Sequence, residues 1–221
     1  MPTAAEINVC MAMYSQLDTG SGLVETLSVS LQQRKQRSSF QFRLAPRLCL
    51  MLEQNPEPYM SRLQELAAEV GAMLKARNET IAVSESSSGG LVSAALLAVP
   101  GASVYFVGGA VIYTAQARDT FLDVDLNSHT GMRSATEPYA LLCAQSAREK
   151  LNTTWGLSET GSAGPTGNRY GDPAGHTCVA ISGPVELSDT LETSISDRAD
   201  NMELFSVKAL ELLAKALNQA T

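Results

Sequence analysis

The stretch from Thr80 to Gly90, which reads T-I-A-V-S-E-S-S-S-G-G, constrains the fold of this chain more than any other stretch. Its first part, Ile81 to Val83, is a short apolar run of the kind found in buried strands. Three serines and two glycines follow. Apolar residues then recur at helical spacing, at Leu91, Val92, Ala95 and Leu96. We therefore predict a strand, a tight turn and a helix in direct succession.

The composition of the predicted turn is suited to nucleophilic catalysis or to anion binding. A turn of this kind directs backbone N–H groups and hydroxyls from a helix N-terminus toward the cleft above the strand. Ser86 follows Glu85 in the turn, and Ser88 is predicted to cap the helix. A serine in this position can act as a nucleophile beside donors for an oxyanion, or it can bind an anion. The alternative is a loop that only turns the chain, because Ser and Gly are ordinary turn residues.

Helices alternate with short apolar strands along the later part of the chain. We expect helices at 60–77, 88–98, 115–121, 136–151 and 201–218. We expect strands at 80–84, at 104–114 as two short runs joined through Gly108-Gly109, at 155–162, and at 176–181 and 185–195 as a hairpin. This alternation predicts a layered α/β domain.

A second loop rich in Gly and Pro follows the strand expected at 155–162. It reads G-S-A-G-P-T-G-N from Gly161 to Asn168, which excludes regular structure. Its N–H groups and hydroxyls are able to line a pocket, whereas the alternative is a plain surface turn.

Length and residue usage limit the class of protein. A chain of 221 residues that is 44% hydrophobic can build one good core, with or without a tail. No apolar run reaches the length needed to span a membrane, so no membrane partner is expected. Only two histidines are present, and the cysteines lie far apart, at Cys10, Cys49, Cys143 and Cys178. This pattern argues against a structural zinc site and a disulfide scaffold, and it favours a reducing, cytoplasmic location.

Residues 1–57 differ in composition from the rest. No acidic residue occurs between Glu25 and Glu53, and arginine, serine and glutamine alternate there with apolar residues. This composition is similar to that of an organellar transit segment, which makes an organellar location the alternative. The other interpretation is a poorly ordered extension or a weak extra element. We predict a boundary after residue 57, with 58–221 as the functional domain.

The net charge of −7 falls entirely on that domain, since residues 58–221 hold 11 basic and 18 acidic residues. An acidic domain without a basic stripe is a poor binder of nucleic acid. A small anionic ligand remains compatible with this charge, because local N–H groups can hold a phosphate.

Five motifs in this order resemble the C-terminal domain of the competence/damage-inducible protein CinA. The family pattern E-S-C-T-G-G corresponds to the sequence from Glu85 to Gly90. The further matches are Pro100-Gly101-Ala102-Ser103 followed by Tyr105, Gly108-Gly109 and Tyr113-Thr114; Ala135-Thr136-Glu137-Pro138; Gly161 to Gly167; and Pro173-Ala174-Gly175-His176-Thr177. The order and spacing hold from the helix at 60–77 to the C-terminus.

The resemblance implies a three-layer α/β/α sandwich and an amidohydrolase. Family members hydrolyse the carboxamide of nicotinamide mononucleotide to nicotinate mononucleotide and ammonia, a step of pyridine nucleotide salvage. Ser86 would be the nucleophile, and Tyr113 a proton-transfer or orienting group. Two loops would hold the nucleotide and the oxyanion, through Glu85, Ser87, Ser88, Gly89, Gly90, Gly161, Ser162, Ala163, Gly164, Pro165, Thr166 and Gly167. The resemblance also implies self-association, with neither a metal nor a cofactor.

The chain departs from the family at one catalytic position. The family has a lysine five residues after the tyrosine, where this chain has Arg118. A buried lysine can lose its proton and act as a base, but an arginine cannot. Arg118 is therefore expected either to favour a Tyr113 tyrosinate electrostatically or to bind the substrate phosphate. His129 lies outside the motifs, and His176 lies only at the edge of the last one. A Ser–His–Asp triad is therefore not expected.

Two alternatives to an active amidase follow. The first is a nucleotide-binding or regulatory domain of the same fold that has lost turnover because of Arg118. The second is an interaction protein of competence or DNA-damage responses.

Overall fold

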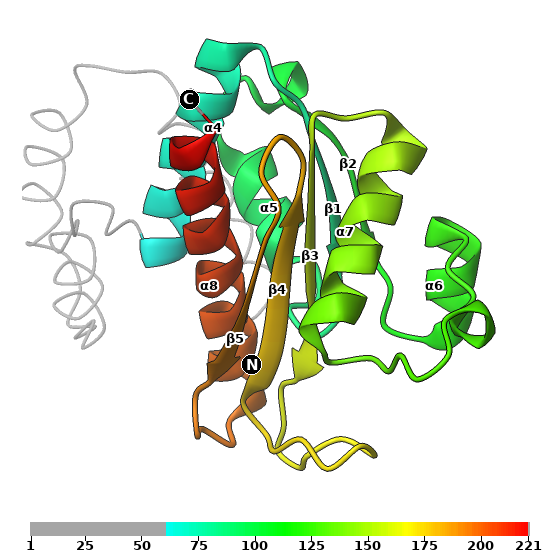
Figure 1. Ribbon diagram of the computed structural model, residues 1–221. Coiled ribbons are helices and arrows are strands. Elements are labelled where there is room, and N and C mark those ends of the chain that lie inside the picture. Colours follow the sequence, from blue (N-terminus) through cyan, green and yellow to red (C-terminus); the bar gives the residue numbers. More distant parts are fainter. Residues whose placement is uncertain (1–60, 221) are drawn as a thin grey trace, which may run out of the picture. The chain divides into compact units, whose positions relative to one another are not determined.

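The computed structural model describes residues 61–220, so the predictions for residues 1–57 lie outside the described part. The described residues form a five-stranded sheet covered by helices on both faces (Figure 1). The helices are α4 (Arg62–Arg77), α5 (Leu91–Ala98), α6 (Ala115–Leu122), α7 (Glu137–Leu151) and α8 (Arg198–Gln219). The strands are β1 (Ile81–Glu85), β2 (Phe106–Val111), β3 (Trp155–Ser162), β4 (His176–Ser182) and β5 (Leu187–Glu192). Short 3-10 helices occupy Ala102–Val104 and Leu126–Ser128.

The strand order is β2-β1-β3-β4-β5. β1 is parallel to both β2 and β3, whereas β4 is antiparallel to β3 and β5. The carboxyl ends of the three parallel strands therefore meet at one edge of the sheet. In open α/β sheets this edge is where ligands bind.

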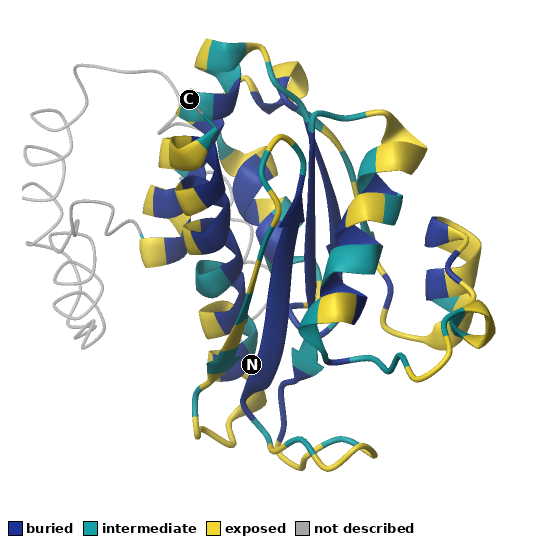
Figure 2. Cartoon of the chain, viewed as in Figure 1, coloured by how far each residue is buried: buried dark blue, intermediate teal, exposed yellow. Residues whose placement is uncertain are grey.

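Three layers result from this arrangement, as the resemblance predicted. α4, α5 and α8 cover one face of the sheet, and α7 covers the other (Figure 1). The three central strands, β1, β3 and β4, are buried along almost all of their length, whereas half-buried and exposed residues alternate along the edge strands β2 and β5 (Figure 2). The core beneath α4 and α8 includes Trp155, Leu210 and Leu213, which are fully buried. Burial of apolar surface on this scale is the main force that holds the layers together.

The helix expected at 60–77 is confirmed as α4, which begins at Arg62 and ends where it was predicted to end. The Ser61 hydroxyl accepts a hydrogen bond from the Gln64 N–H, and the Gln64 side chain accepts one from the Ser61 N–H, which is a capping box. Asn78 ends the helix in the left-handed conformation, at φ 54°. The expected strand at 155–162, the helices after residues 115 and 136, and the hairpin are confirmed as β3, α6, α7 and β4–β5.

Two local predictions are wrong. The helix expected from residue 88 begins at Leu91, and its N-cap is Gly90, at φ 102°, rather than Ser88. The two runs expected at 104–114 form the single strand β2, which continues through the glycines. A Cβ on Gly109 would lie 2.2 Å from the Ser93 hydroxyl, so glycine allows α5 to approach this strand.

Within residues 61–220, none of the helices is both long enough and apolar enough to cross a membrane.

Candidate functional site

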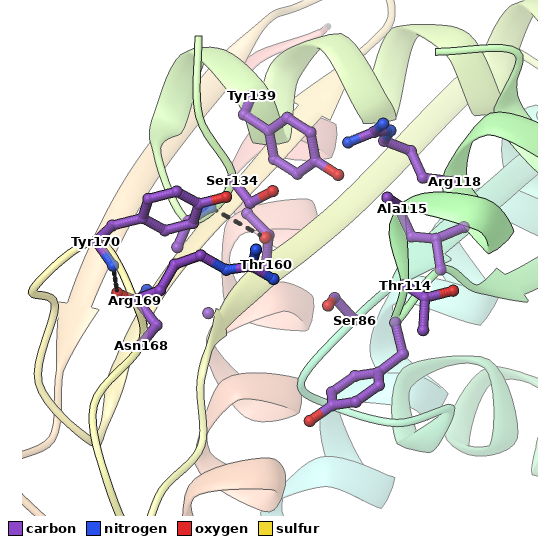
Figure 3. A pocket seen from close by; sticks show the side chains of 14 residues that line it. Ser86, Thr114, Ala115, Arg118, Ser134, Tyr139, Thr160, Asn168, Arg169 and Tyr170 are labelled. Atoms are coloured by element: carbon purple, nitrogen blue, oxygen red, sulfur yellow. Dashed lines mark hydrogen bonds between the residues drawn. The ribbon is translucent and has the colours of Figure 1, made fainter. Parts of the chain in front are cut away.

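A cavity of about 470 Å³ lies at the carboxyl ends of β1, β2 and β3 (Figure 3). The turn after β1, the segment after β2, the start of α7 and the loop after β3 form its walls. Its lining residues are Ser86, Ile112, Tyr113, Thr114, Ala115, Arg118, Ser134, Ala135, Tyr139, Thr160, Gly161, Asn168, Arg169 and Tyr170. The cavity is thus assembled from segments that are distant in the sequence.

Ser86 occupies the wall contributed by the turn after β1. It is half-buried, and its backbone N–H donates to Glu159 Oε2 at 3.1 Å. Its hydroxyl makes no hydrogen bond with the residues that the structure describes, and it is therefore available to a ligand in the cavity.

Glu159 is a fully buried carboxylate on β3 that holds this turn. Its Oε2 also accepts from the Ser88 N–H at 2.8 Å, and its Oε1 accepts from the hydroxyls of Ser87 and Thr177. Four donors thus surround one carboxylate. An ionised carboxylate accepts hydrogen bonds only, so this set of partners satisfies it without a cation.

Glu85, at the end of β1, is a second fully buried carboxylate. It accepts from the N–H groups of Gly90, Val92 and Ser93 at 2.9 to 3.0 Å, and from the hydroxyls of Ser88 and Ser93. This side chain therefore caps α5, in place of the expected Ser88.

The two carboxylates correct the expected role of the turn. The N–H groups of the turn and of the start of α5 were predicted to face a ligand. Most of them donate to Glu85 and Glu159 instead. Glu85, Ser87 and Ser88 are buried and do not line the cavity, so their side chains can affect a ligand only indirectly. The Ser87 N–H is the amide of the turn that has no acceptor among the described residues.

Tyr113 lies at the exposed side of the cavity. Arg198, the first residue of α8, donates from Nη2 to the Tyr113 hydroxyl at 3.3 Å, and its guanidinium carbon lies 5.8 Å from the centre of the ring. Arg198 also donates to the Gly164 carbonyl at 3.0 Å, which ties α8 to the loop after β3. The cation beside Tyr113 is therefore Arg198, which the sequence patterns did not reveal.

Arg118 is buried at the other side of the cavity. Its Nε donates to Asp119 and to the Val124 carbonyl, both at 2.8 Å, and its Nη2 donates to Asp119 at 2.5 Å. Burial alone would lower the pKa of Arg118, but the interactions with Asp119 and Tyr139 outweigh burial and raise it. Arg118 thus stays protonated and is held beside Tyr139, and its hydrogen bonds do not go to Tyr113.

The wall before α7 contains Ala135, a non-glycine residue with φ 57°. Its N–H donates to the Thr160 hydroxyl, and its carbonyl accepts from Nε2 of His176 at 3.0 Å. The His176 Nδ1 lies 2.5 Å from the Glu192 carboxylate on β5. Burial alone would lower the pKa of His176, but these two acceptors outweigh burial and raise it.

The loop after β3 is held rigidly across the cavity. Arg133 donates two hydrogen bonds to the Asp172 carboxylate, at 2.5 and 2.9 Å, and the Asn168 side chain donates a third at 2.8 Å. These contacts, the one with Arg133 first, lower the pKa of Asp172. The Asn168 side chain also accepts from the backbone N–H groups of Tyr170 and Asp172.

Sequence comparison identifies the family. The model of the CinA C-terminal domain matches residues 63–217. The chain belongs to the CinA C-terminal domain family.

Curated relatives agree with this membership. A CinA-like protein of Salinibacter ruber is 38% identical over 153 residues, which are 69% of this chain and 37% of the relative. A CinA-like protein of Cyanothece is 39% identical over 126 residues, 57% of this chain and 30% of the relative. The matched part of the chain thus spans about a third of the length of these relatives.

Solved structures of the CinA superfamily share the fold. The competence/damage inducible protein CihA of Agrobacterium tumefaciens is 27% identical, with a TM-score of 0.67, over 72% of this chain and 97% of that protein. The competence damage-inducible protein A of Klebsiella pneumoniae, at 23% identity, has a TM-score of 0.68 over 72% of this chain and 99% of that protein.

Of the residues expected from the CinA motifs, the structure brings Ser86, Tyr113, Arg118 and Gly161 to one cavity. The other predicted loop residues, Gly89, Gly90 and those from Ser162 to Gly167, do not line it. The Ser162 hydroxyl donates to the Thr166 carbonyl, within that loop. Contacts with a ligand by these residues stay predictions.

Sequence reasoning missed several residues of the site. Thr160 and Glu159 are polar side chains in a strand that is otherwise buried, which was the available signal. Arg169 and Tyr170 lie in a loop that was predicted only as a continuation of the Gly-rich segment. Within residues 61–220, no group of three or more His, Cys, Asp or Glu side chains is arranged to hold a metal ion.

Proposed function

We propose that this cavity hydrolyses the carboxamide of nicotinamide mononucleotide to nicotinate mononucleotide and ammonia. The observation that carries the proposal is the free hydroxyl of Ser86, in a strand–turn–helix connection that opens into the cavity. The family resemblance supplies the substrate.

The chemistry requires attack by the Ser86 oxygen on the carboxamide carbon. The tetrahedral intermediate carries an oxyanion, which needs a preorganised donor. In serine hydrolases with a strand–turn–helix nucleophile, the N–H of the residue after the serine supplies it. Here that residue is Ser87, whose N–H has no acceptor among the described residues. Breaking the C–N bond then releases ammonia, and water hydrolyses the ester on Ser86.

Proton transfer in this scheme falls to Tyr113. Tyr113 lines the same cavity, and its hydroxyl accepts a hydrogen bond from the Arg198 guanidinium. Arg118 cannot act as the base, because its guanidinium stays protonated. Its contacts with Asp119, Val124 and Tyr139 support instead the wall of the cavity.

The test is ammonia release from nicotinamide mononucleotide by the full chain and by Ser86→Ala. We expect release by the wild type and a loss of at least about 1,000-fold in the variant, since removing a catalytic nucleophile has effects of this size or larger. The variant should still be stabilised by the nucleotide in thermal unfolding. Undiminished release by Ser86→Ala would contradict the assignment of the nucleophile.

A second candidate function is nucleotide binding without turnover. Two observations favour it: arginine replaces the family lysine at position 118, and the carboxylates Glu85 and Glu159 occupy most donors at the start of α5. In that case the wild type is stabilised by the nucleotide but releases no ammonia.

A further inference from the structure

A nucleotide bound in this cavity needs a cationic partner for its phosphate. Few side chains can supply one, because the domain is acidic overall. The N-terminus of α5 would ordinarily attract an anion. Here Glu85 and Glu159 already occupy that position with two buried carboxylates. An anionic group placed beside them would be repelled, so the phosphate needs a cation elsewhere.

Arg118, which lines the cavity, and Arg198, which contacts the lining residue Tyr113, already have hydrogen-bond partners. Arg118 is buried, and its guanidinium donates to Asp119 and to the Val124 carbonyl. Arg198 donates to the Gly164 carbonyl and to the Tyr113 hydroxyl, and its guanidinium lies near the Tyr113 ring. Both arginines therefore have fixed partners around the cavity.

Arg169 differs from these two. It is exposed and lines the cavity, and it forms no hydrogen bond or ion pair with the residues that the structure describes. Its guanidinium carbon lies 5.8 Å from the centre of the Tyr170 ring. Figure 3 shows the side chain extending from the loop into the cavity, on the wall opposite Ser86.

The loop presents Arg169 in a fixed place. Asn168, the preceding residue, is hydrogen-bonded to Asp172, and Asp172 is in turn held by Arg133. The same bonds occupy the Asp172 carboxylate, which lies in the same loop as Arg169. Asp172 therefore has partners other than Arg169. A cation that is held in place and has no carboxylate partner can pair with an anionic ligand at little cost in ordering.

We infer that Arg169 determines specificity in this cavity by pairing with an anionic group of the ligand, which is the 5′-phosphate in the proposed substrate. A guanidinium is well suited to this role, because its planar donors match two phosphate oxygens at once. The inference rests on the proposed function for the identity of the ligand. It adds that the phosphate lies over the loop after β3 and away from the start of α5.

The test compares nicotinamide mononucleotide with nicotinamide riboside, which has the same carboxamide and ribose but no phosphate. Dissociation constants from calorimetry and ammonia release are measured for the wild type, Arg169→Gln and Arg169→Lys. We expect Arg169→Gln to weaken binding of the mononucleotide by about 10- to 100-fold, the effect of losing a charged hydrogen bond, with the riboside unchanged. Arg169→Lys should recover part of the loss, because it restores the charge.

Arg77→Gln is the matched control, since Arg77 lies at the end of α4 and does not line the cavity. It should leave the affinity for both ligands unchanged. An equal loss for the mononucleotide and the riboside in Arg169→Gln would overturn the inference, because Arg169 would then act on the part that the two ligands share. Unchanged affinity for the mononucleotide would overturn it as well.

The readouts separate this inference from the proposed activity. Arg169-dependent binding without ammonia release would support the inference and refute the amidase. Ammonia release that does not depend on Arg169 would support the amidase and refute the inference. A wild type that does not bind the mononucleotide would refute both.

Discussion

Two buried carboxylates, Glu85 and Glu159, adjoin the turn that carries Ser86 and have no cationic partner within residues 61–220. Their hydrogen bonds explain how such an arrangement is stable. A buried charge is costly unless hydrogen bonds replace the water that it has lost. Glu85 has five donors and Glu159 has four, all from the turn, the start of α5 and the neighbouring strands. The turn that carries Ser86 is therefore held from both sides, by β1 and by β3.

The first prediction at the residue scale concerns Glu159→Gln. The new amide group would face donors where the carboxylate accepted hydrogen bonds, so we expect a loss of about 1–3 kcal/mol in unfolding free energy. The Ser86 turn should also lose its fixed position. Ammonia release should then fall more in kcat than in KM, because the nucleophile is misplaced while the ligand contacts remain.

Thr177→Val provides the control for this variant. It removes a donor from the β4 side of the same carboxylate and leaves the contacts to the turn in place. Its unfolding free energy should fall by about 1 kcal/mol, with kcat retained. An equal fall of kcat in both variants would mean that general destabilisation, and not the position of Ser86, explains the effect.

Sequence reasoning placed individual site residues with uneven success. Ser86 was singled out from the composition of its turn, whereas Tyr113 was assigned only by the resemblance to the CinA family. The partner of Tyr113 was missed, since Arg198 lies 85 residues away and reaches the cavity only through the docking of α8. Glu159 was missed because a residue in the middle of a buried strand has no local signature of its partners.

At the scale of elements, His176 joins three parts of the fold. It lies on β4, contacts Glu192 on β5, and donates to the carbonyl of Ala135 in the wall before α7. Both ring nitrogens face acceptors, so the protonated ring satisfies both and the neutral ring satisfies one. The charge of this histidine therefore helps to hold the strained Ala135 backbone at the cavity.

This arrangement predicts a pH dependence of stability. The pKa of His176 is raised in the folded state above its ordinary value of about 6.5. Its stabilising contribution is therefore fully present below about pH 6.5 and is lost as the pH rises through the raised folded-state value. Unfolding free energy measured in urea should fall over that interval.

His176→Gln should flatten the pH dependence, because it removes the titrating ring. The other titratable groups near the ring do not account for a change in unfolding free energy between pH 6 and 8. The pKa of Asp172 is lowered, chiefly by Arg133, and burial raises the pKa of Cys178. A variant with the same slope as the wild type between pH 6 and 8 would refute the role of His176.

The elements themselves were predictable where local signals were complete. α4 has an apolar face, a capping box at Ser61 and a left-handed Asn78, all of which can be recognised from sequence. The start of α5 was placed too early, because Ser88 is a good cap by type but Glu85 occupies the donors first. β2 was divided in two at its glycines, of which Gly109 admits the Ser93 side chain and Gly108 faces Leu151.

At the scale of the whole molecule, the parallel order of β1, β2 and β3 creates the cavity. Ser86, Tyr113 and Thr160 follow or end different strands, and the common strand direction brings them to one edge. The alternation of helices and strands was sufficient to predict a layered α/β domain, and the turn after the strand at 80–84 was predicted to face a cleft. The strand order that brings the three strand ends together was not predicted. The opposite wall depends on the irregular loop that carries Arg169, whose path follows from the contacts of Asp172 and Asn168 rather than from a periodic pattern.

The last prediction is that residues 58–221 fold and bind ligand without residues 1–57. Pro58–Thr221 forms a unit by contacts, and its core is built from side chains of α4, α5, α8 and the sheet. The capping box between Ser61 and Gln64 satisfies two N-terminal donors of α4 from within the domain itself. A domain of this size can bury a core of its own.

Thermal unfolding of the chain that begins at Pro58 should therefore remain cooperative, with a midpoint within about 4 °C of the full chain, the shift that corresponds to about 1 kcal/mol. Its affinity for nicotinamide mononucleotide should be unchanged, because the described residues that line the cavity all lie between Ser86 and Tyr170. Loss of cooperative unfolding would show that residues 1–57 contribute to the core. Retained folding with lost affinity would show instead that these residues reach the ligand, which would place them in the functional site.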